Sequence, residues 1–261
     1  MYKYYTLYIK KPIQLQKEFH IPKGTKTQIY DELYALLYDD IQNNSKKALH
    51  YANIVNRYLP NDFYYIDTYC RTASIFSYLQ TTNNFGIDSS YEMIENAKKK
   101  YPTKIFYNKE VSTIHTLYSS IYVDGIGCFT TLLFSYKHWE WVIQQFCKKI
   151  KKTGYIFICI IDTNTLYPEY KKLQYNNNNT TIYYEKKFIK NTLNYLQKET
   201  FTIDKNIYTY IIPLYTPTIC NFELFCKKNS IDIIQKIQYP KPSYYYKEYV
   251  YVLQPKVLQE R

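Results

Sequence analysis

Glycine is scarce in this sequence, which has only five glycines among 261 residues. Glycine is the usual residue where the backbone needs a positive φ or approaches a ligand closely, so such loops must here use other residues. Arginine is also scarce and occurs only as Arg57, Arg71 and Arg261. Bidentate recognition of phosphates and bases favours arginine over lysine, which argues against sequence-specific readout of nucleic acid.

Long apolar runs are absent as well. A membrane-spanning helix needs about 20 apolar residues, whereas the longest run here is IFICII at 156–161. The N-terminal stretch MYKYYTLYIKKP has no apolar segment followed by a small-residue cleavage site, so we expect no secretory signal. These absences predict a soluble, cytoplasmic protein that makes no membrane contact.

No Cys-x-x-Cys pair occurs. No histidine is separated from another histidine or from a cysteine by the spacing that metal ligands on a helix have. This pattern predicts reduced thiols that fill core space and no metal site. The six cysteines are Cys70, Cys128, Cys147, Cys159, Cys220 and Cys226, and the four histidines are His20, His50, His115 and His138.

The composition is otherwise that of one sizeable folded unit. It is 46% hydrophobic and 21% charged, with a formal charge of +12. Lysine, asparagine, isoleucine and tyrosine are all abundant, a bias that an AT-rich genome such as that of a large DNA virus imposes. The lysine-rich surface nevertheless predicts a nucleic-acid or acidic-protein partner.

The apolar pattern predicts an α/β fold. The amphipathic stretch IYDELYALLYDDI (29–41) and a second over 45–58 predict two helices that form an N-terminal cap, and the sequence PND at 60–62 then breaks the chain. Apolar strands and helical stretches alternate from there. The expected strands are FYYI (63–66), NFGID (84–88), KIFY (104–107), SSIYVDGIG (119–127) and YIFICII (155–161), and the expected helices are 74–80, 89–101 and 139–152.

Continuously apolar strands that alternate with helices indicate a Rossmann-like, mostly parallel sheet covered on both faces. We expect Ser89 and Glu92 to form a capping box on one helix, and Gly154 to close another. Asp124 lies inside an apolar strand, so we expect it either to face a pocket with a functional partner or to mark an earlier strand end.

After Asp162 the pattern changes to strand-rich sequence interrupted by an asparagine loop at 176–179. We expect an antiparallel β insertion here, followed by a helix over 218–229 and two closing strands of the main sheet. The predicted divisions are 1–60 for the extension and cap, 61–162 for the nucleotide-binding core, and 163–261 for the insertion and closing elements.

Four segments of the core carry a family pattern. YIDTYCRTA (65–73) fits the motif hydrophobic-hydrophobic-Asp-x-Gly-x-Gly-x-Gly, with Tyr69, Arg71 and Ala73 where the glycines belong. GIDSSYEMIENA (86–97), FYNKEV (106–111) and IKKTGYIFI (150–158) match its later motifs in order and spacing. Over roughly residues 28–162, the sequence resembles the class I S-adenosylmethionine-dependent methyltransferases.

That resemblance implies a cofactor site for S-adenosylmethionine at the carboxyl ends of the first strands. It assigns Asp88 to the ribose hydroxyls, Glu110 to the adenine side and Asp67 to the amino-acid end of the cofactor. The spacing supports the first assignment, because Asp88 follows Asp67 by about twenty residues, as a ribose-binding acid does. Ser89 and Gly127 belong to the same predicted set.

Each of these acids also has a structural interpretation. Asp88 could interact with a helix dipole, Glu110 could be an exposed loop acid, and Asp67 could initiate a turn. No general base stands out, and the catalytic residues stay unassigned.

Tyr69 and Arg71 place bulk and charge where the cofactor would pass. Two functional hypotheses follow. One is a methyltransferase with a divergent, weakened cofactor site, and the other is a catalytically inactive member of the fold that binds a protein or nucleic acid.

Overall fold

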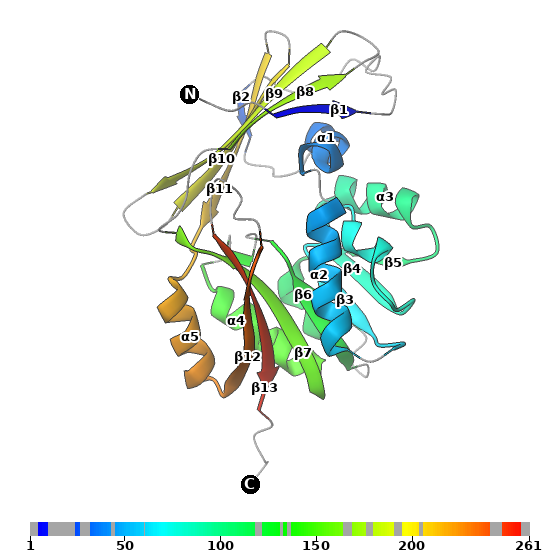
Figure 1. The fold of residues 1–261 in the computed structure, drawn as a ribbon, viewed down its shortest axis with the longest axis vertical. Helices are drawn as coiled ribbons and strands as arrows, with labels where there is room; N and C mark the ends of the chain where they lie inside the picture. Colours follow the sequence, from blue (N-terminus) through cyan, green and yellow to red (C-terminus); the bar gives the residue numbers. More distant parts are fainter. Residues whose placement is uncertain are drawn as a thin grey trace.

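The computed structural model describes residues 5–9, 24–26, 32–42, 45–59, 61–117, 122–130, 133–134, 137–163, 169–175, 180–190, 195–203, 206–240 and 247–256. Two sheets dominate these residues (Figure 1). A seven-stranded sheet forms the lower part in that view, and a six-stranded sheet lies above it.

The seven-stranded sheet is the predicted Rossmann-like core. Its strand order is β12-β13-β7-β6-β3-β4-β5, and within it β13 alone runs antiparallel to its neighbours. The strands are β3 (Tyr65–Thr68), β4 (Asn84–Asp88), β5 (Ile105–Asn108), β6 (Val123–Cys128), β7 (Ile150–Ile161), β12 (Ile231–Gln238) and β13 (Glu248–Pro255). The chain order reverses between β3 and β6, so a crevice is expected at the carboxyl ends of these two strands.

Helices cover both faces of this sheet, as the apolar strands required. Helix α2 (Ser45–Tyr58), the short 3-10 helix η1 (Ser74–Ser77) and α3 (Tyr91–Lys100) pack on one face, around Tyr65 and Phe157. Helix α4 (Trp139–Lys149), the 3-10 helix η2 (Val111–Thr116) and α5 (Ile219–Lys228) pack on the other. The predicted cap is confirmed: α1 (Glu32–Gln42) and α2 follow each other before the core.

The second sheet contains the predicted antiparallel insertion. Strands β8 (Glu169–Tyr175), β9 (Thr180–Lys190), β10 (Tyr195–Ile203) and β11 (Asn206–Leu214) pair antiparallel in sequence order. Two N-terminal strands that we did not predict, β1 (Tyr5–Ile9) and β2 (Gly24–Lys26), extend its two edges in parallel pairings. The asparagine loop at 176–179 lies outside the described residues.

Helix α1 joins this second sheet to the core. Tyr34 of α1 donates a hydrogen bond of 2.5 Å to the buried carboxylate of Glu199 in β10, which also accepts one of 2.9 Å from Tyr184. On the side of the core, Asn96 of α3 donates a hydrogen bond to the Ala35 carbonyl. The cap helix is therefore held between the two sheets, close to the carboxyl ends of the core strands (Figure 1).

Several local predictions were wrong. The helix expected over 74–80 is a single turn at Ser74–Ser77. The capping residue of α3 is Ser90, whose hydroxyl accepts from the Met93 amide, so Ser89 lies one position too early to cap. Gly154 does not close α4, which ends at Lys149; it lies within β7, where a side chain would meet the Asp124 carbonyl at 2.7 Å.

The expectation for Asp124 was also wrong. Asp124 is the second residue of β6, beside a bulge, so it neither faces a pocket nor marks the carboxyl end of the strand. Its carboxylate accepts a hydrogen bond of 2.9 Å from the Tyr64 amide and forms an ion pair of 2.7 Å with Lys151. The carboxylate that interrupts this apolar segment is therefore paired, and it lies at the amino end of the sheet.

No helix within the described ranges has both the length and the apolar character needed to span a membrane. The six cysteines are free thiols, and Cys70, Cys128, Cys159 and Cys226 are buried.

Candidate functional site

The loop between β3 and η1 adopts an unusual backbone. Tyr69, Arg71 and Ala73 have φ angles of 53°, 55° and 55°, in the left-handed region that favours glycine. These are the three positions at which the resembling family has glycine. A left-handed conformation costs about 1–2 kcal/mol for a residue with a side chain. The loop therefore keeps a glycine-type path although it contains no glycine.

Asp88, at the end of β4, holds this loop in place. One of its carboxylate oxygens accepts a hydrogen bond of 3.0 Å from the Arg71 amide, and the other accepts one of 2.9 Å from the Ser90 amide. Only 2% of Asp88 is exposed. Burial raises the pKa of Asp88 above its ordinary value, and the two amide hydrogen bonds and the Arg71 guanidinium oppose that rise.

Asp88→Ala is expected to lower the free energy of unfolding by about 2–3 kcal/mol, because two buried amides lose their acceptor and the strained loop loses its anchor. Urea denaturation followed by circular dichroism measures the change. Asp232→Ala, on the exposed β12, is the matched control and is expected to change stability by less than about 0.5 kcal/mol. An Asp88 variant as stable as this control would contradict the anchoring role.

A cavity lies beside the loop at the carboxyl ends of β3 and β6. Its volume is about 70 Å³, and it is partly open to solvent. Four aromatic side chains and two cations line it, from α1, α2, the loop and the segment after β6. The lining residues are Tyr38, Lys47, Ala48, Tyr51, Asp67, Tyr69, Cys70, Arg71, Ser74, Ile75 and Phe129.

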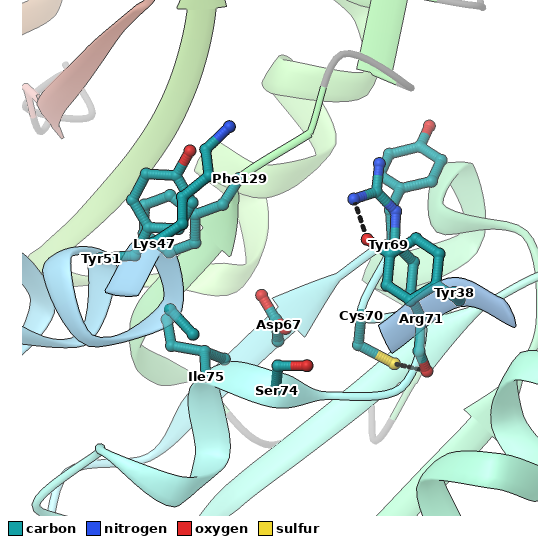
Figure 2. Close-up of a pocket in the computed structure, with 11 residues that line it drawn as sticks. Tyr38, Lys47, Tyr51, Asp67, Tyr69, Cys70, Arg71, Ser74, Ile75 and Phe129 are labelled. Carbon is teal, nitrogen blue, oxygen red and sulfur yellow. Dashed lines mark hydrogen bonds between the residues drawn. The ribbon is translucent and has the colours of Figure 1, made fainter. Parts of the chain in front are cut away.

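Asp67 occupies the floor of this cavity. In Figure 2 its carboxyl group lies between a cluster that contains Tyr51 and Phe129 and a cluster that contains Tyr69 and Arg71. Only 6% of Asp67 is exposed, and burial raises its pKa from 3.8 to about 8. The Arg71 guanidinium opposes this rise, while the Asp88 carboxylate adds to it. At neutral pH the floor of the cavity thus carries a largely protonated carboxyl group.

The Arg71 side chain crosses from the loop to two other elements. Its guanidinium donates hydrogen bonds to the Tyr38 hydroxyl of α1 and to the Thr130 hydroxyl after β6. It also lies 5.2 Å from the centre of the Tyr38 ring. Tyr69, beside it, is 7% exposed and belongs to the cavity wall.

The opposite wall is built around a buried carboxylate. The rings of Tyr51 and Phe129 stack at 4.3 Å and 11°. Glu248, at the start of β13, accepts a hydrogen bond from the Tyr51 hydroxyl and forms an ion pair of 2.6 Å with Lys47. Burial acts to raise the pKa of Glu248, but Lys47 and the accepted hydrogen bonds leave it below its ordinary value. The ion pair with Glu248 keeps the Lys47 ammonium at the cavity.

The structure brings only part of the predicted set together. Asp67, Tyr69 and Arg71 line the cavity, and Asp88 supports it from beneath the loop. Glu110 is exposed at the start of η2, and Ser89 is exposed beside Asp88, where its carbonyl accepts from Asn108. Neither of these two residues lines the cavity.

Gly127 lies in the middle of the sheet, in β6, against the Tyr65 hydroxyl of β3. Its lack of a side chain makes room for that hydroxyl, so its place in the fold is one of packing.

Sequence reasoning missed the wall that the cap provides. Tyr38, Lys47 and Tyr51 come from α1 and α2, and Phe129 comes from the segment after β6. Their spacing predicted amphipathic helices but not that both helices meet over the carboxyl ends of β3 and β6. Among the described residues, no group of three histidine, cysteine or acidic side chains could hold a metal ion.

We compared the sequence and the structure with those of known proteins. No protein-family model matches the sequence, and no curated protein matches it. Solved structures do match. DesVI from Streptomyces venezuelae is 12% identical, with a TM-score of 0.70 over 87% of this chain and all of that one. An S-adenosylmethionine-dependent methyltransferase from Clostridium acetobutylicum is 16% identical, with a TM-score of 0.62 over 86% and 98% of the two chains.

The sugar N-methyltransferase KedS8 from Streptoalloteichus is 12% identical, with a TM-score of 0.67 over 91% of this chain and all of that one. At such low identities the likeness concerns the fold. This chain has the fold of the class I S-adenosylmethionine-dependent methyltransferases.

Proposed function

We propose that this chain is an S-adenosylmethionine-dependent methyltransferase of weak activity, with its cofactor site in the cavity beside the 69–73 loop. One observation carries the proposal: the backbone is left-handed at Tyr69, Arg71 and Ala73, the three positions of the family glycines. Strained backbone of this kind costs of order 1–3 kcal/mol per residue and persists mainly at functional sites.

The residues around the cavity suit such a cofactor. Asp67 at its floor can meet the ammonium of the amino-acid end, and the end of β4 at Asp88 lies where a ribose would approach. When bound, the cofactor supplies an electrophilic methyl group. The chain's own contribution is to hold the cofactor and the acceptor in line, which leaves little residue signature. Weak activity follows from Tyr69 and Arg71, which reduce the room for the cofactor.

A second candidate is a catalytically inactive subunit of the same fold. The hydrogen bonds of Asp88 favour this candidate. Both of its carboxylate oxygens already accept hydrogen bonds from backbone amides, and the hydroxyls of a ribose would have to share these oxygens. The partner of such a subunit, an acidic protein or a nucleic acid on the lysine-rich surface, stays a prediction.

Isothermal titration calorimetry with S-adenosylmethionine and S-adenosylhomocysteine tests the proposal. We expect at least one of them to bind with a Kd of roughly 1–100 μM, or about −8 to −5.5 kcal/mol. Ser74→Trp fills the cavity from its rim and is expected to abolish binding. Ser77→Trp, an exposed position on the same turn, is the matched control and should bind like the wild type.

Folded wild-type protein that binds neither compound would overturn the proposal and favour the inactive subunit. Binding that survives in Ser74→Trp would place the cofactor elsewhere and contradict the assignment of this cavity.

A further inference from the structure

A separate groove lies between helices α4 and α5, on the face of the core sheet opposite α2 (Figure 1). Its volume is about 540 Å³, it is open to solvent, and it shares no lining residue with the cavity beside the 69–73 loop. Gln144 of α4 donates a hydrogen bond of 3.0 Å to Asn229 at the end of α5, so the two walls are tied together. The groove is therefore distinct from the proposed cofactor site.

Trp141 supplies an exposed aromatic ring to this groove. It is 46% exposed, whereas Trp139, the only other tryptophan of the sequence, is 7% exposed and packs against Phe225 in the core. The ring of His115 in η2 lies nearly perpendicular to the Trp141 ring, with their centres 6.4 Å apart. Among the described residues no ring stacks face to face on Trp141, so its face is available to a flat ring of a ligand.

Positive charge surrounds the groove. Four exposed lysines either line it or lie within one helical turn of a residue that does, and none of the four forms an ion pair within the described ranges. They are Lys137, Lys148, Lys227 and Lys228. Glu140 is the one acidic side chain among the described lining residues, so the charge around the groove is net positive. Cations that no carboxylate neutralises attract phosphates.

An aromatic platform beside unneutralised cations suits single-stranded nucleic acid, whose bases stack on such rings while its phosphates meet the cations. We propose that this groove binds single-stranded nucleic acid, with a base on Trp141 and the adjacent phosphates near Lys148 and Lys228. A duplex offers the same phosphates but keeps its bases stacked on one another, so it should bind more weakly. The scarcity of arginine fits binding without sequence preference, because arginine is the usual reader of base edges.

The groove suits a partner helix less well. A helix that docks in a groove buries an apolar face whose residues recur over two or more turns. The exposed apolar side chains among the described lining residues are Trp141 and Leu224, since Phe225 is only 8% exposed. Two such side chains offer too little apolar surface for a helix face, whereas one ring is enough for a base to stack on.

Fluorescence anisotropy of a labelled oligothymidylate of about 20 nucleotides tests the site. A thymidylate strand carries no adenosine, so the result is independent of the cofactor cavity. We expect a Kd of roughly 1–100 μM at about 50 mM salt, and a slope of log affinity against log salt of about −2 to −3, since each neutralised phosphate of a single strand contributes about −0.7. The stacked base should also quench the fluorescence of Trp141 and leave that of the buried Trp139 unchanged.

Two variants separate stacking from charge. Trp141→Ala removes the ring and should weaken binding about ten-fold while it keeps the salt slope. The double variant Lys227→Gln/Lys228→Gln removes two cations and should make the slope shallower by about 1.4. All three positions are exposed, so the variants should fold, and thermal unfolding checks this.

Exposed positions on α2 and α3 provide matched controls. Tyr91→Ala removes an exposed aromatic ring and Lys46→Gln/Lys99→Gln removes two exposed cations, and both should bind like the wild type. Absence of binding by folded wild-type protein, or full affinity in Trp141→Ala, overturns the proposal. Duplex bound as tightly as the single strand would show attraction by charge alone, and oligoglutamate that competes equally well would indicate an acidic protein partner. Either of these results also overturns it.

Discussion

Gly127→Ala is expected to destabilise the protein by about 2–3 kcal/mol, because an added methyl group would overlap the Tyr65 hydroxyl in the middle of the sheet. Tyr65 is fully buried under α2 and belongs to the core of that face, so its ring has no free direction in which to move. Differential scanning calorimetry should show a melting temperature lower by about 4–12 °C for a chain of this size.

A second substitution identifies the cause. In Tyr65→Phe the hydroxyl is gone, and the nearest atoms to an alanine at position 127 become the ring carbon Cζ at 2.8 Å and Phe129 at 2.9 Å. The double variant should therefore recover about half of the loss. Tyr65→Phe by itself should change stability much less than Gly127→Ala, because the phenylalanine ring keeps the packing of the buried tyrosine ring.

Gly125→Ala, two positions earlier in β6, provides the contrast. Its methyl group would meet the end of the Leu59 side chain, which can rotate, so a smaller loss is expected. If Gly127→Ala proves as stable as the wild type, or if Tyr65→Phe gives no recovery, the packing role of Gly127 is wrong. The cofactor role assigned to it by resemblance would then regain support.

Much of the fold could be predicted because buried strands and helix faces leave regular patterns of apolar residues in the sequence. Strand β7 has a continuous apolar run from Ile156 to Ile161, and β4 coincides with the predicted NFGID. The amphipathic stripes of α1 and α2 were equally clear, because each has one face buried. These signals depend only on residues close in sequence, which is why sequence reasoning finds them.

The parts that were missed depend on contacts distant in sequence. Strands β1 and β2 are short, and it is their pairing with β8 and β11 that makes them strands. The N-cap of α3 is Ser90 and not the predicted Ser89, and the Ser90 amide itself donates a hydrogen bond to the Asp88 carboxylate.

The location of the candidate site could be predicted from the sequence, but the backbone conformation of its loop could not. Asp67 and the loop were placed correctly at the carboxyl end of the sheet, since strand order fixes that edge. The left-handed backbone at Tyr69, Arg71 and Ala73 could not be predicted from residue types, because such residues rarely adopt it. The use of Asp88 as an anchor for that backbone follows only from the geometry.

Asp67→Asn is expected to remove a marked pH dependence of stability. In the folded protein the pKa of Asp67 is about 8, against 3.8 when exposed, so the folded state holds a proton that the unfolded state releases. Stability is greatest below pH 4, falls as the pH rises, and levels off above pH 8. The full difference corresponds to on the order of 5 kcal/mol.

Urea denaturation at several pH values from 4 to 9 measures this slope. The asparagine variant has no carboxyl group at the cavity floor and should be clearly more stable than wild type at pH 9, with little difference near pH 4. Asp232→Asn, a surface acid paired with Lys256, is the control and should follow the wild-type slope. Parallel curves for wild type and Asp67→Asn would show that Asp67 titrates normally.

The same titration should be coupled to binding at the proposed cofactor site. A bound ammonium beside Asp67 would favour the carboxylate and draw its pKa down, so binding near pH 7 should release close to one proton. Calorimetry of S-adenosylhomocysteine binding in two buffers with different ionisation enthalpies counts that proton. In Asp67→Asn the count should fall to near zero, and a count that is unchanged in this variant would place the ammonium away from Asp67.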